Sequence, residues 1–302
     1  MRRPDTPLPS ERREFPGFDG GAWVADIAGP ADAPTVLLLP GGGQTRHAWG
    51  GTAQAMARAG WRSIALDLPG HGESAWSVAG DYRIETLSRS MARLWHEIGT
   101  PLAVVGASLG GLISMAAVAR GDAPTINALA LVDIAPRIEA TGVDRIVNFM
   151  RAHPEGFATL EDAALHIASY RGRPVAAHPR GLQKNLRLNA AGRWTWHWDQ
   201  RLMNDDNHNH RDDPAFFERT LAQYAGPLML VRGARSDVIS EAGAEVFRKA
   251  FPQAHFVNLP GAGHMVAGDA NDAFTASLIG FLGRVMPAAP IVIQSTLGVS
   301  EP

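Results

Sequence analysis

The chain has 302 residues, of which 45% are hydrophobic and 19% are charged, and its formal net charge is −2. This length and composition predict a globular protein with a sizeable core, built as one large α/β domain with an insertion or as two small domains. The small net charge argues against binding to nucleic acid or to an anionic membrane surface. The sequence contains no cysteine, which excludes disulfides, thiol catalysis and thiolate metal sites.

The N-terminal segment, residues 1–14, is charged and proline-rich and lacks the apolar core of a signal peptide. The longest apolar run, residues 102–119, contains Ser108 and several glycines. It therefore fits a buried strand and helix better than a membrane span. We expect a cytoplasmic protein that does not associate with membranes. Its oligomeric state stays open between monomer and homodimer.

Short apolar strands alternate with helices along most of the chain. Strands are expected at residues 35–39, 63–66, 102–105, 128–132, 228–231 and 255–259, and helices at residues 45–59, 84–98, 240–250 and 271–285. This alternation predicts an α/β fold with a mostly parallel sheet covered by helices on both faces. Residues 23–27, which follow two glycines, are expected to supply an antiparallel hairpin at the sheet edge.

Residues 138–213 interrupt this alternation. They separate two strands of one expected sheet and are too long for a simple crossover. We expect an inserted helical cap over the carboxyl ends of the strands, where open α/β sheets bind ligands. The chain would then consist of a core (residues 14–137 and 214–286), the cap (138–213) and a C-terminal tail (287–302).

The sequence Gly106-Ala107-Ser108-Leu109-Gly110 lies between an expected strand and an expected helix. A G-x-S-x-G pattern in that context is typical of a nucleophile elbow, a sharp turn that lifts a serine hydroxyl clear of the sheet. The glycines leave room for a strained serine backbone. We therefore predict that Ser108 is a nucleophile.

A serine nucleophile needs a base, and the base needs a carboxylate that orients it. His264 follows the last expected strand within a glycine-rich loop and is the best candidate for the base. Asp237 follows the preceding strand and is the predicted acid. Asp133, at the end of an earlier strand, is its main rival. The predicted order of serine, acid and histidine is the chain order of an α/β-hydrolase.

Two backbone amides are candidates for an oxyanion hole. One is the amide of Leu109, directly after the nucleophile. The other belongs to Gly42, in the Pro40-Gly41-Gly42-Gly43 loop after the first parallel strand. Glycine at this position lets the backbone come close to a substrate carbonyl.

These motifs resemble the α/β-hydrolase superfamily, in its esterase, haloperoxidase and epoxide-hydrolase-like branch. The segments that carry the resemblance are Leu39–Gly43, Asp67–Ser74, Gly106–Gly111, Gly233–Asp237 and Gly263-His264. The chain departs from the family pattern at one place, because Pro40-Gly41 stands where His-Gly is usual. That histidine is not a triad member, so the departure concerns the geometry of the oxyanion loop.

The resemblance implies a serine hydrolase that cleaves carboxylic esters of small molecules through an acyl-enzyme, with no metal and no organic cofactor. A serine at position 108 argues against epoxide hydrolases and haloalkane dehalogenases, which use an aspartate. Carbon–carbon bond hydrolysis, lactone hydrolysis and cofactor-free perhydrolysis use the same triad and remain alternatives. Carbon–carbon bond hydrolases often have tryptophan after the histidine, where this chain has Met265.

A non-catalytic ligand-binding protein of the same fold is a more remote alternative, because all three triad positions are filled. His71, in a Gly-His-Gly turn, is expected to be structural. Trp194, Trp196 and Trp198 share a face only in an extended segment, and we expect them to pack in the cap or to line its pocket. Residues 205–212 contain histidines and aspartates, but a solvated loop is favoured over a metal site.

Overall fold

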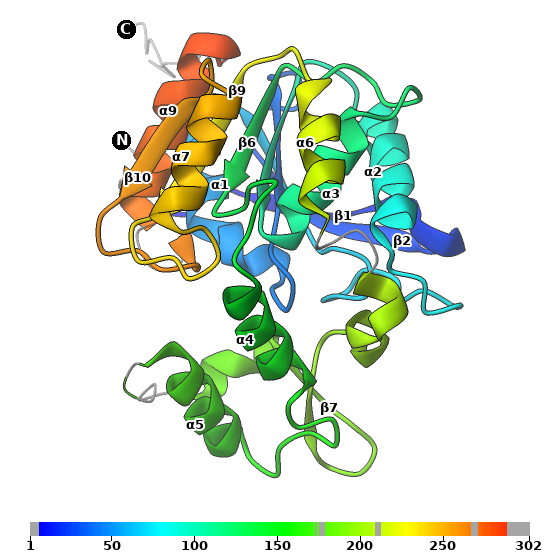
Figure 1. Cartoon of the computed structure of the whole chain (residues 1–302). Coiled ribbons are helices and arrows are strands. Elements are labelled where there is room, and N and C mark those ends of the chain that lie inside the picture. Colours follow the sequence, from blue (N-terminus) through cyan, green and yellow to red (C-terminus); the bar gives the residue numbers. More distant parts are fainter. Residues whose placement is uncertain (1–5, 173, 175–178, 209–212, 267–270, 289–302) are drawn as a thin grey trace, which may run out of the picture.

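A single eight-stranded sheet forms the centre of the molecule (Figure 1). The computed structural model describes residues 6–172, 174, 179–208, 213–266 and 271–288. Its strand order is β1-β2-β4-β3-β5-β6-β9-β10, and the strands from β4 to β10 run parallel. The strands are β1 (Ser10–Pro16), β2 (Ala22–Ala28), β3 (Thr35–Leu39), β4 (Arg62–Leu66), β5 (Leu102–Ala107), β6 (Ala128–Val132), β9 (Leu228–Gly233) and β10 (His255–Leu259).

Helices cover both faces of the sheet because the side chains of each strand alternate between them. Leu37 and Leu39 of β3 face one hydrophobic cluster, and Val36 and Leu38 face the other. The first cluster includes side chains of α2 (Ile84–Ile98), α3 (Leu109–Val118), α6 (Pro214–Ala222) and α7 (Glu241–Ala250). The second includes side chains of α1 (Gly50–Arg58) and α9 (Asn271–Val285). Both faces are therefore closed to water.

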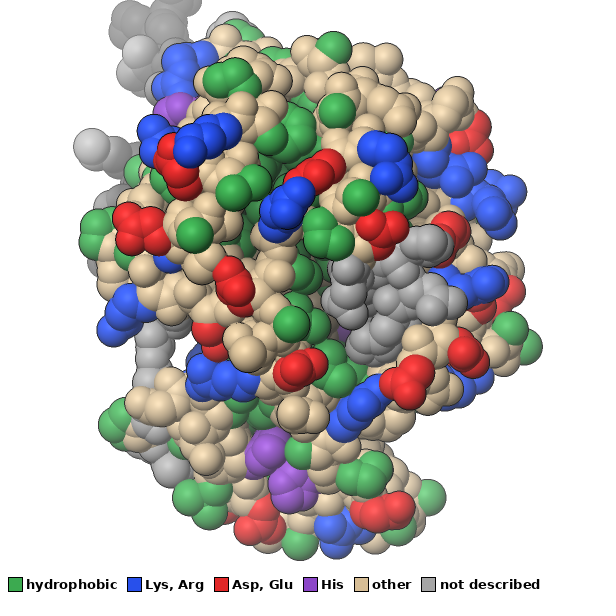
Figure 2. All heavy atoms as spheres, in the orientation of Figure 1, with side chains coloured by type: hydrophobic (Ala, Val, Ile, Leu, Met, Phe, Trp, Pro, Cys, Tyr) green, Lys and Arg blue, Asp and Glu red, His purple; other side chains and the backbone are tan. Residues whose placement is uncertain are grey.

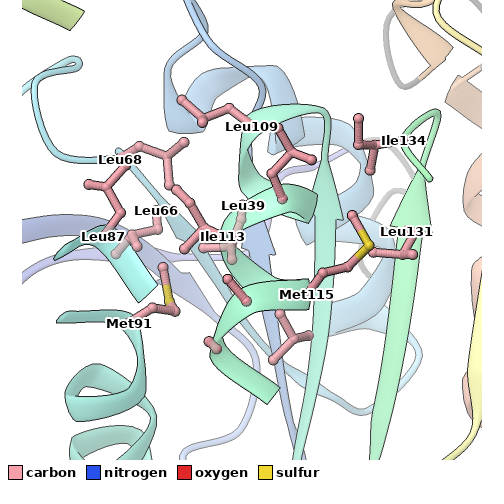
Figure 3. Packing of buried hydrophobic residues seen from close by; sticks show 14 of the residues in the cluster. Leu39, Leu66, Leu68, Leu87, Met91, Leu109, Ile113, Met115, Leu131 and Ile134 are labelled. Atoms are coloured by element: carbon pink, nitrogen blue, oxygen red, sulfur yellow. The ribbon is translucent and has the colours of Figure 1, made fainter. Parts of the chain in front are cut away.

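The first cluster packs against α3, the helix that directly follows Ser108. Figure 3 shows Leu39 and Leu66 from the sheet meeting Met91 of α2 and Ile113 of α3. All four side chains are completely buried. Burial of a side chain of this size contributes about 1.5–3 kcal/mol, so this packing fixes α3 and its N-terminus against the sheet.

The predicted core elements are confirmed, including the fold class and the antiparallel hairpin, which pairs β1 with β2 at the sheet edge. The hairpin begins at Ser10, so the core starts earlier than residue 14. β1 is exposed at six of its seven positions, and it therefore lacks the apolar signal of the inner strands. Of the predicted tail, residues 289–302 lie outside the described part of the chain.

Between β6 and α6 the chain forms a separate lobe, at the bottom of Figure 1. We call residues 138–213 the insertion. It contains α4 (Ala140–Arg151), α5 (Leu160–Arg171), the hairpin β7 (Leu186–Leu188) and β8 (Trp194–Trp196), and the short 3-10 helices η3 (Pro179–Lys184), η4 (Gln200–Met203) and η5 (Asp205–His208).

Charged side chains of both signs are interspersed over the face of the molecule in Figure 2, as the small net charge leads one to expect. Among the helices that the structure describes, none combines the length and hydropathy that a membrane span requires.

Candidate active site

Ser108 occupies the turn between β5 and α3 in a strained conformation, with φ 45° and ψ −116°. The flanking glycines make this turn possible. A Cβ atom at position 106 would lie 2.6 Å from the Gly110 carbonyl oxygen, and one at position 110 would lie 2.7 Å from Leu39. The G-x-S-x-G spacing therefore reflects close backbone approach, and the strain at Ser108 is typical of a functional turn.

The neighbouring strand places Asp133 beside this turn. β5 and β6 are parallel, and Ala107 pairs with Val132, so Ser108 and Asp133 follow paired residues at the same edge of the sheet. The Ser108 amide donates to the Val132 carbonyl over 3.2 Å. Asp133 also has a positive φ, 49°. The register of two adjacent strands thus brings a hydroxyl and a carboxylate to one place.

The Asp133 carboxylate is completely buried and accepts three hydrogen bonds. His264 Nδ1 lies 2.7 Å from Oδ2, the hydroxyl of Ser236 donates to the same oxygen, and the Gly233 amide donates to Oδ1 over 2.9 Å. These contacts fix His264 in the tautomer or charge state that has a proton on Nδ1. They leave Nε2 as the ring nitrogen available for proton transfer.

The loop that carries His264 is held against the end of β9. The amide of Arg235 donates to the Ala262 carbonyl over 2.8 Å, and the amide of Ala234 donates to Leu259 over 2.9 Å. A Cβ atom at position 233 would lie 2.3 Å from the Gly263 carbonyl oxygen, so glycine is required there. The position of the imidazole is therefore set by backbone contacts between neighbouring loops.

Asp237 does not reach His264, and the prediction that it orients the imidazole is wrong. Its carboxylate accepts from Arg145 of α4 over 3.0 Å, and its side chain is 40% exposed. A Cβ atom at Gly142 would lie 2.1 Å from the Asp237 carbonyl oxygen, so Asp237 belongs to the contact between the core and the insertion. The rival residue Asp133 makes the contact instead.

Ser108 and His264 line the same cavity, without a hydrogen bond between these two described residues. Such contacts are often long in enzymes without substrate and tighten when substrate binds. Of the three predicted catalytic side chains, the structure therefore brings Ser108 and His264 to one cavity and leaves Asp237 outside it.

Both predicted oxyanion donors belong to residues that line, together with Ser108, a second and smaller cavity. Gly42 lies next to Leu109, since a Cβ atom at position 42 would come within 3.8 Å of the Leu109 side chain. Leu109 is the first residue of α3, where helix amides have no partner within the helix. Within the described residues, neither the Gly42 amide nor the Leu109 amide has a hydrogen-bond acceptor. Both N–H groups are therefore available to an incoming oxygen.

A tight turn fixes the loop that carries Gly42. The Gly41 carbonyl accepts from the Gln44 amide over 3.1 Å, and the Gln44 side chain accepts from the Gly41 amide over 3.0 Å. Gly43 has φ 74°, a conformation that favours glycine. The Gln44 side chain also donates to the sulfur of Met265, which ties this loop to that of His264.

Two buried histidines hold the peptide groups of Gly43, and sequence reasoning missed one of them. The Gly43 amide donates to His71 Nε2 over 3.0 Å, and the Gly43 carbonyl lies 3.3 Å from Nε2 of His197 in the insertion. His197 Nδ1 accepts from the Gly72 amide over 2.9 Å. Burial, together with the neighbouring His71, lowers the pKa of His197 to about 3, so its ring stays neutral near pH 7.

The sequence model of the alpha/beta hydrolase fold family matches residues 34–270. The chain belongs to this family. It is 32% identical over 278 residues to the esterase Rv0045c of Mycobacterium tuberculosis, with 87% of this chain and 86% of that protein covered. It is 28% identical over 264 residues to the sn-1-specific diacylglycerol lipase ABHD11 of Mus musculus, with 85% and 83% covered.

A crystal structure of an alpha/beta hydrolase from Novosphingobium aromaticivorans has the same fold. Its TM-score is 0.75, its sequence identity is 23%, and the match covers 91% of this chain and 99% of that chain. Within the α/β-hydrolase family, the chain is a carboxylesterase-like hydrolase.

The cavity that Ser108 and His264 line is also lined by side chains of the insertion. Trp196 and Trp198 both line it, and their rings stack with centroids 4.5 Å apart and planes 12° from parallel. Both side chains are buried, so they serve the packing of the insertion and the wall of the cavity together. β8 is extended over Trp194 and Trp196, and Trp198 follows two residues beyond its end.

The polar loop at residues 205–212 has a structural role where it is described. Asn207 is buried, and its side chain accepts from the Tyr82 amide and donates to the carbonyls of Gly80 and Arg201. Residues 209–212, including His210, lie outside the described part of the chain. Over the residues that are described, no group of three or more His, Asp or Glu side chains could hold a metal ion.

Proposed function

We propose that this protein hydrolyses carboxylic esters of small molecules through an acyl-enzyme on Ser108, with His264 as general base and Asp133 as the carboxylate that orients it. The observation that carries the proposal is the 2.7 Å contact between His264 Nδ1 and Asp133 Oδ2. It lies at the carboxyl ends of β5 and β6, beside the Ser108 turn. A buried carboxylate in this position holds the imidazole in place and stabilises its protonated form.

In the first half of the reaction, Ser108 Oγ attacks the ester carbonyl carbon as its proton moves to His264 Nε2. The amides of Gly42 and Leu109 donate to the oxygen that becomes negative. Removing one such donor typically costs about 3–4 kcal/mol of transition-state stabilisation. The carbon–oxygen bond of the ester then breaks, and His264 gives its proton to the leaving alcohol.

In the second half, a water molecule takes the place of the alcohol. His264 accepts a proton from this water as its oxygen attacks the acyl carbon, and the same two amides hold the second oxyanion. Collapse of this intermediate returns the proton to Ser108 Oγ and releases the carboxylic acid. Each step uses side chains and amides of this chain, with water as the only co-reactant.

The proposal is tested by hydrolysis of p-nitrophenyl esters from acetate to decanoate, with the wild type and Ser108→Ala compared at equal concentration. We expect Ser108→Ala to lower kcat by about three orders of magnitude or more, because the nucleophile is lost. Labelling by a fluorophosphonate probe should disappear in the same variant. A wild type that hydrolyses none of the esters, or a variant that keeps its activity, would overturn the proposal.

A further inference from the structure

The cavity around Ser108 has two arms, and the position of His264 distinguishes them. Ser108 and Gly42 line both arms, whereas His264 lines only the larger one. In the proposed mechanism, His264 must protonate the oxygen of the leaving alcohol. The alcohol part of an ester therefore lies in the larger arm, and the acyl part lies in the smaller arm.

The smaller arm is apolar and limited in size. Apart from Ser108 and His71, the described side chains that line it are hydrophobic, among them Leu112, Val147 and Met150. Its volume is about 80 Å³. Since a water-sized group needs ~10–15 Å³ on this measure, the arm holds an acyl chain of roughly five to eight heavy atoms.

The larger arm has a different chemistry. Its volume is about 310 Å³, and its lining includes His47, Arg171 and Lys184 but no described aspartate or glutamate. Nδ1 of His47 lies 3.8 Å from Oδ2 of Asp26, so this side chain has a carboxylate neighbour. Among the described residues, neither Arg171 nor Lys184 has an ion-pair partner. Arg171 ends α5 and Lys184 ends η3, so two separate elements of the insertion each bring a cation to this arm.

From these observations, and building on the esterase function proposed above, we infer that the preferred substrates join a short to medium apolar acid to an alcohol that carries an anionic group. Cations without counter-ions in a concave site raise the local concentration of anions. Because both side chains are exposed, each contact is expected to raise the affinity only roughly 1.4- to 5-fold.

The test uses two chromogenic esters that differ only in charge at the leaving group, 3-butanoyloxy-4-nitrobenzoate and 3-butanoyloxy-4-nitrobenzamide. At low salt, we expect the wild type to have a kcat/KM about two- to 25-fold higher for the carboxylate than for the amide, because two such contacts act together. The preference should shrink towards one in 0.5 M NaCl, because salt screens exposed charges.

The double variant Arg171→Gln and Lys184→Gln should lose this preference through a higher KM for the carboxylate, with the amide unchanged. Arg219→Gln is the matched control, because Arg219 is an exposed cation on α6 that does not line the cavity. Equal kcat/KM for the two esters, or a double variant that loses activity on both alike, would overturn the inference.

The acyl assignment is tested separately. Val147→Phe should narrow the smaller arm, shorten the best acyl chain and leave the preference for the carboxylate intact. A change in charge preference with no change in acyl length would contradict the assignment of the arms. Loss of all hydrolysis, or activity that survives Ser108→Ala, would instead contradict the esterase function itself, so the two failures are distinguishable.

Discussion

The core and the insertion contribute to the cavity in different ways. On the core side, Ser108, Asp133 and the His264 loop sit at the ends of strands, and strand register and backbone contacts set their positions. On the insertion side, the cavity wall comes from α5, η3 and β8, among other elements. The core thus fixes the positions of the candidate catalytic groups. Substitutions in the insertion can alter which substrates bind without moving those groups.

The two regions meet at several polar contacts, of which two bear on the cavity and its surroundings. Arg145 of the insertion pairs with Asp237 of the core, and His197 of the insertion contacts Gly43 and Gly72. The first contact is exposed, whereas His197 is 2% exposed. Substitutions at these contacts can therefore break or sharpen the division between chemistry and specificity.

The largest expected effect separates the two aspartates. Asp133→Asn should lower kcat by about 10³- to 10⁴-fold, because an amide cannot hold the required tautomer of His264 or stabilise its protonated form. Asp237→Asn is the matched control and should change kcat less than about threefold, since its partner is the exposed Arg145. Steady-state kinetics on one p-nitrophenyl ester, with folding checked by thermal melting, would decide. A larger loss in Asp237→Asn than in Asp133→Asn would contradict the assignment.

The second effect concerns stability in acid. The pKa of His197 is about 3 in the folded protein and ~6.5 in an unfolded chain, so the unfolded state binds more protons between these values. The stabilising contribution of the neutral ring is present above pH ~6.5 and is lost as the pH falls towards 3. Two pH units below 6.5, this loss amounts to roughly 3 kcal/mol.

Urea unfolding at pH 7 and pH 4.5 measures this loss. In His197→Asn, which does not titrate, the drop in unfolding free energy between the two pH values should be smaller by about 3 kcal/mol. Carboxylates also titrate in this range, but they contribute equally to both proteins. An identical drop in the two proteins would mean that His197 is not held neutral.

The smallest effect tests whether the insertion supports the oxyanion loop. His197→Ala removes the contact to the Gly43 carbonyl, next to the Gly42 amide. We expect kcat to fall about tenfold with KM nearly unchanged, less than the 10²- to 10³-fold cost of losing a whole donor. Thr195→Ala is the control, because its hydroxyl donates to the Arg187 carbonyl within the hairpin of the insertion. Titration with a fluorophosphonate would count active sites, and equal kcat in both variants would refute this support.

The sequence predicts the core well because the relevant signals are local. The amphipathic pattern of residues 84–98 gives α2 with its correct bounds, and Ser108 and His264 are identified by neighbouring glycines. The error in the predicted acid has a physical reason. Asp133 and Asp237 both follow strands, and the sequence does not show which of the two side chains contacts His264. Asp133 directly follows β6, the neighbour of β5, whereas Asp237 lies four residues beyond β9. The order of strands in the sheet determines which aspartate lies beside the Ser108 turn, and local sequence patterns do not reveal this order.

For a related reason, the sequence indicates the internal structure of the insertion only in outline. Its strands are three residues long, too short for a periodic pattern to emerge. The His197 contact joins positions 125 residues apart at Gly72, and nothing in the sequence near His197 indicates it. Side chains that act across the boundary between the core and the insertion become visible only in three dimensions.

The pairing of Ala107 with Val132 also bears on how activity appears during folding. A slip of one residue between β5 and β6 would turn Asp133 to the opposite face of the sheet and leave His264 without its carboxylate. A chain that has collapsed but has not found this register would be compact and catalytically silent. The first turnover of a chromogenic ester after dilution from urea would therefore time the moment at which the centre of the sheet is correctly paired.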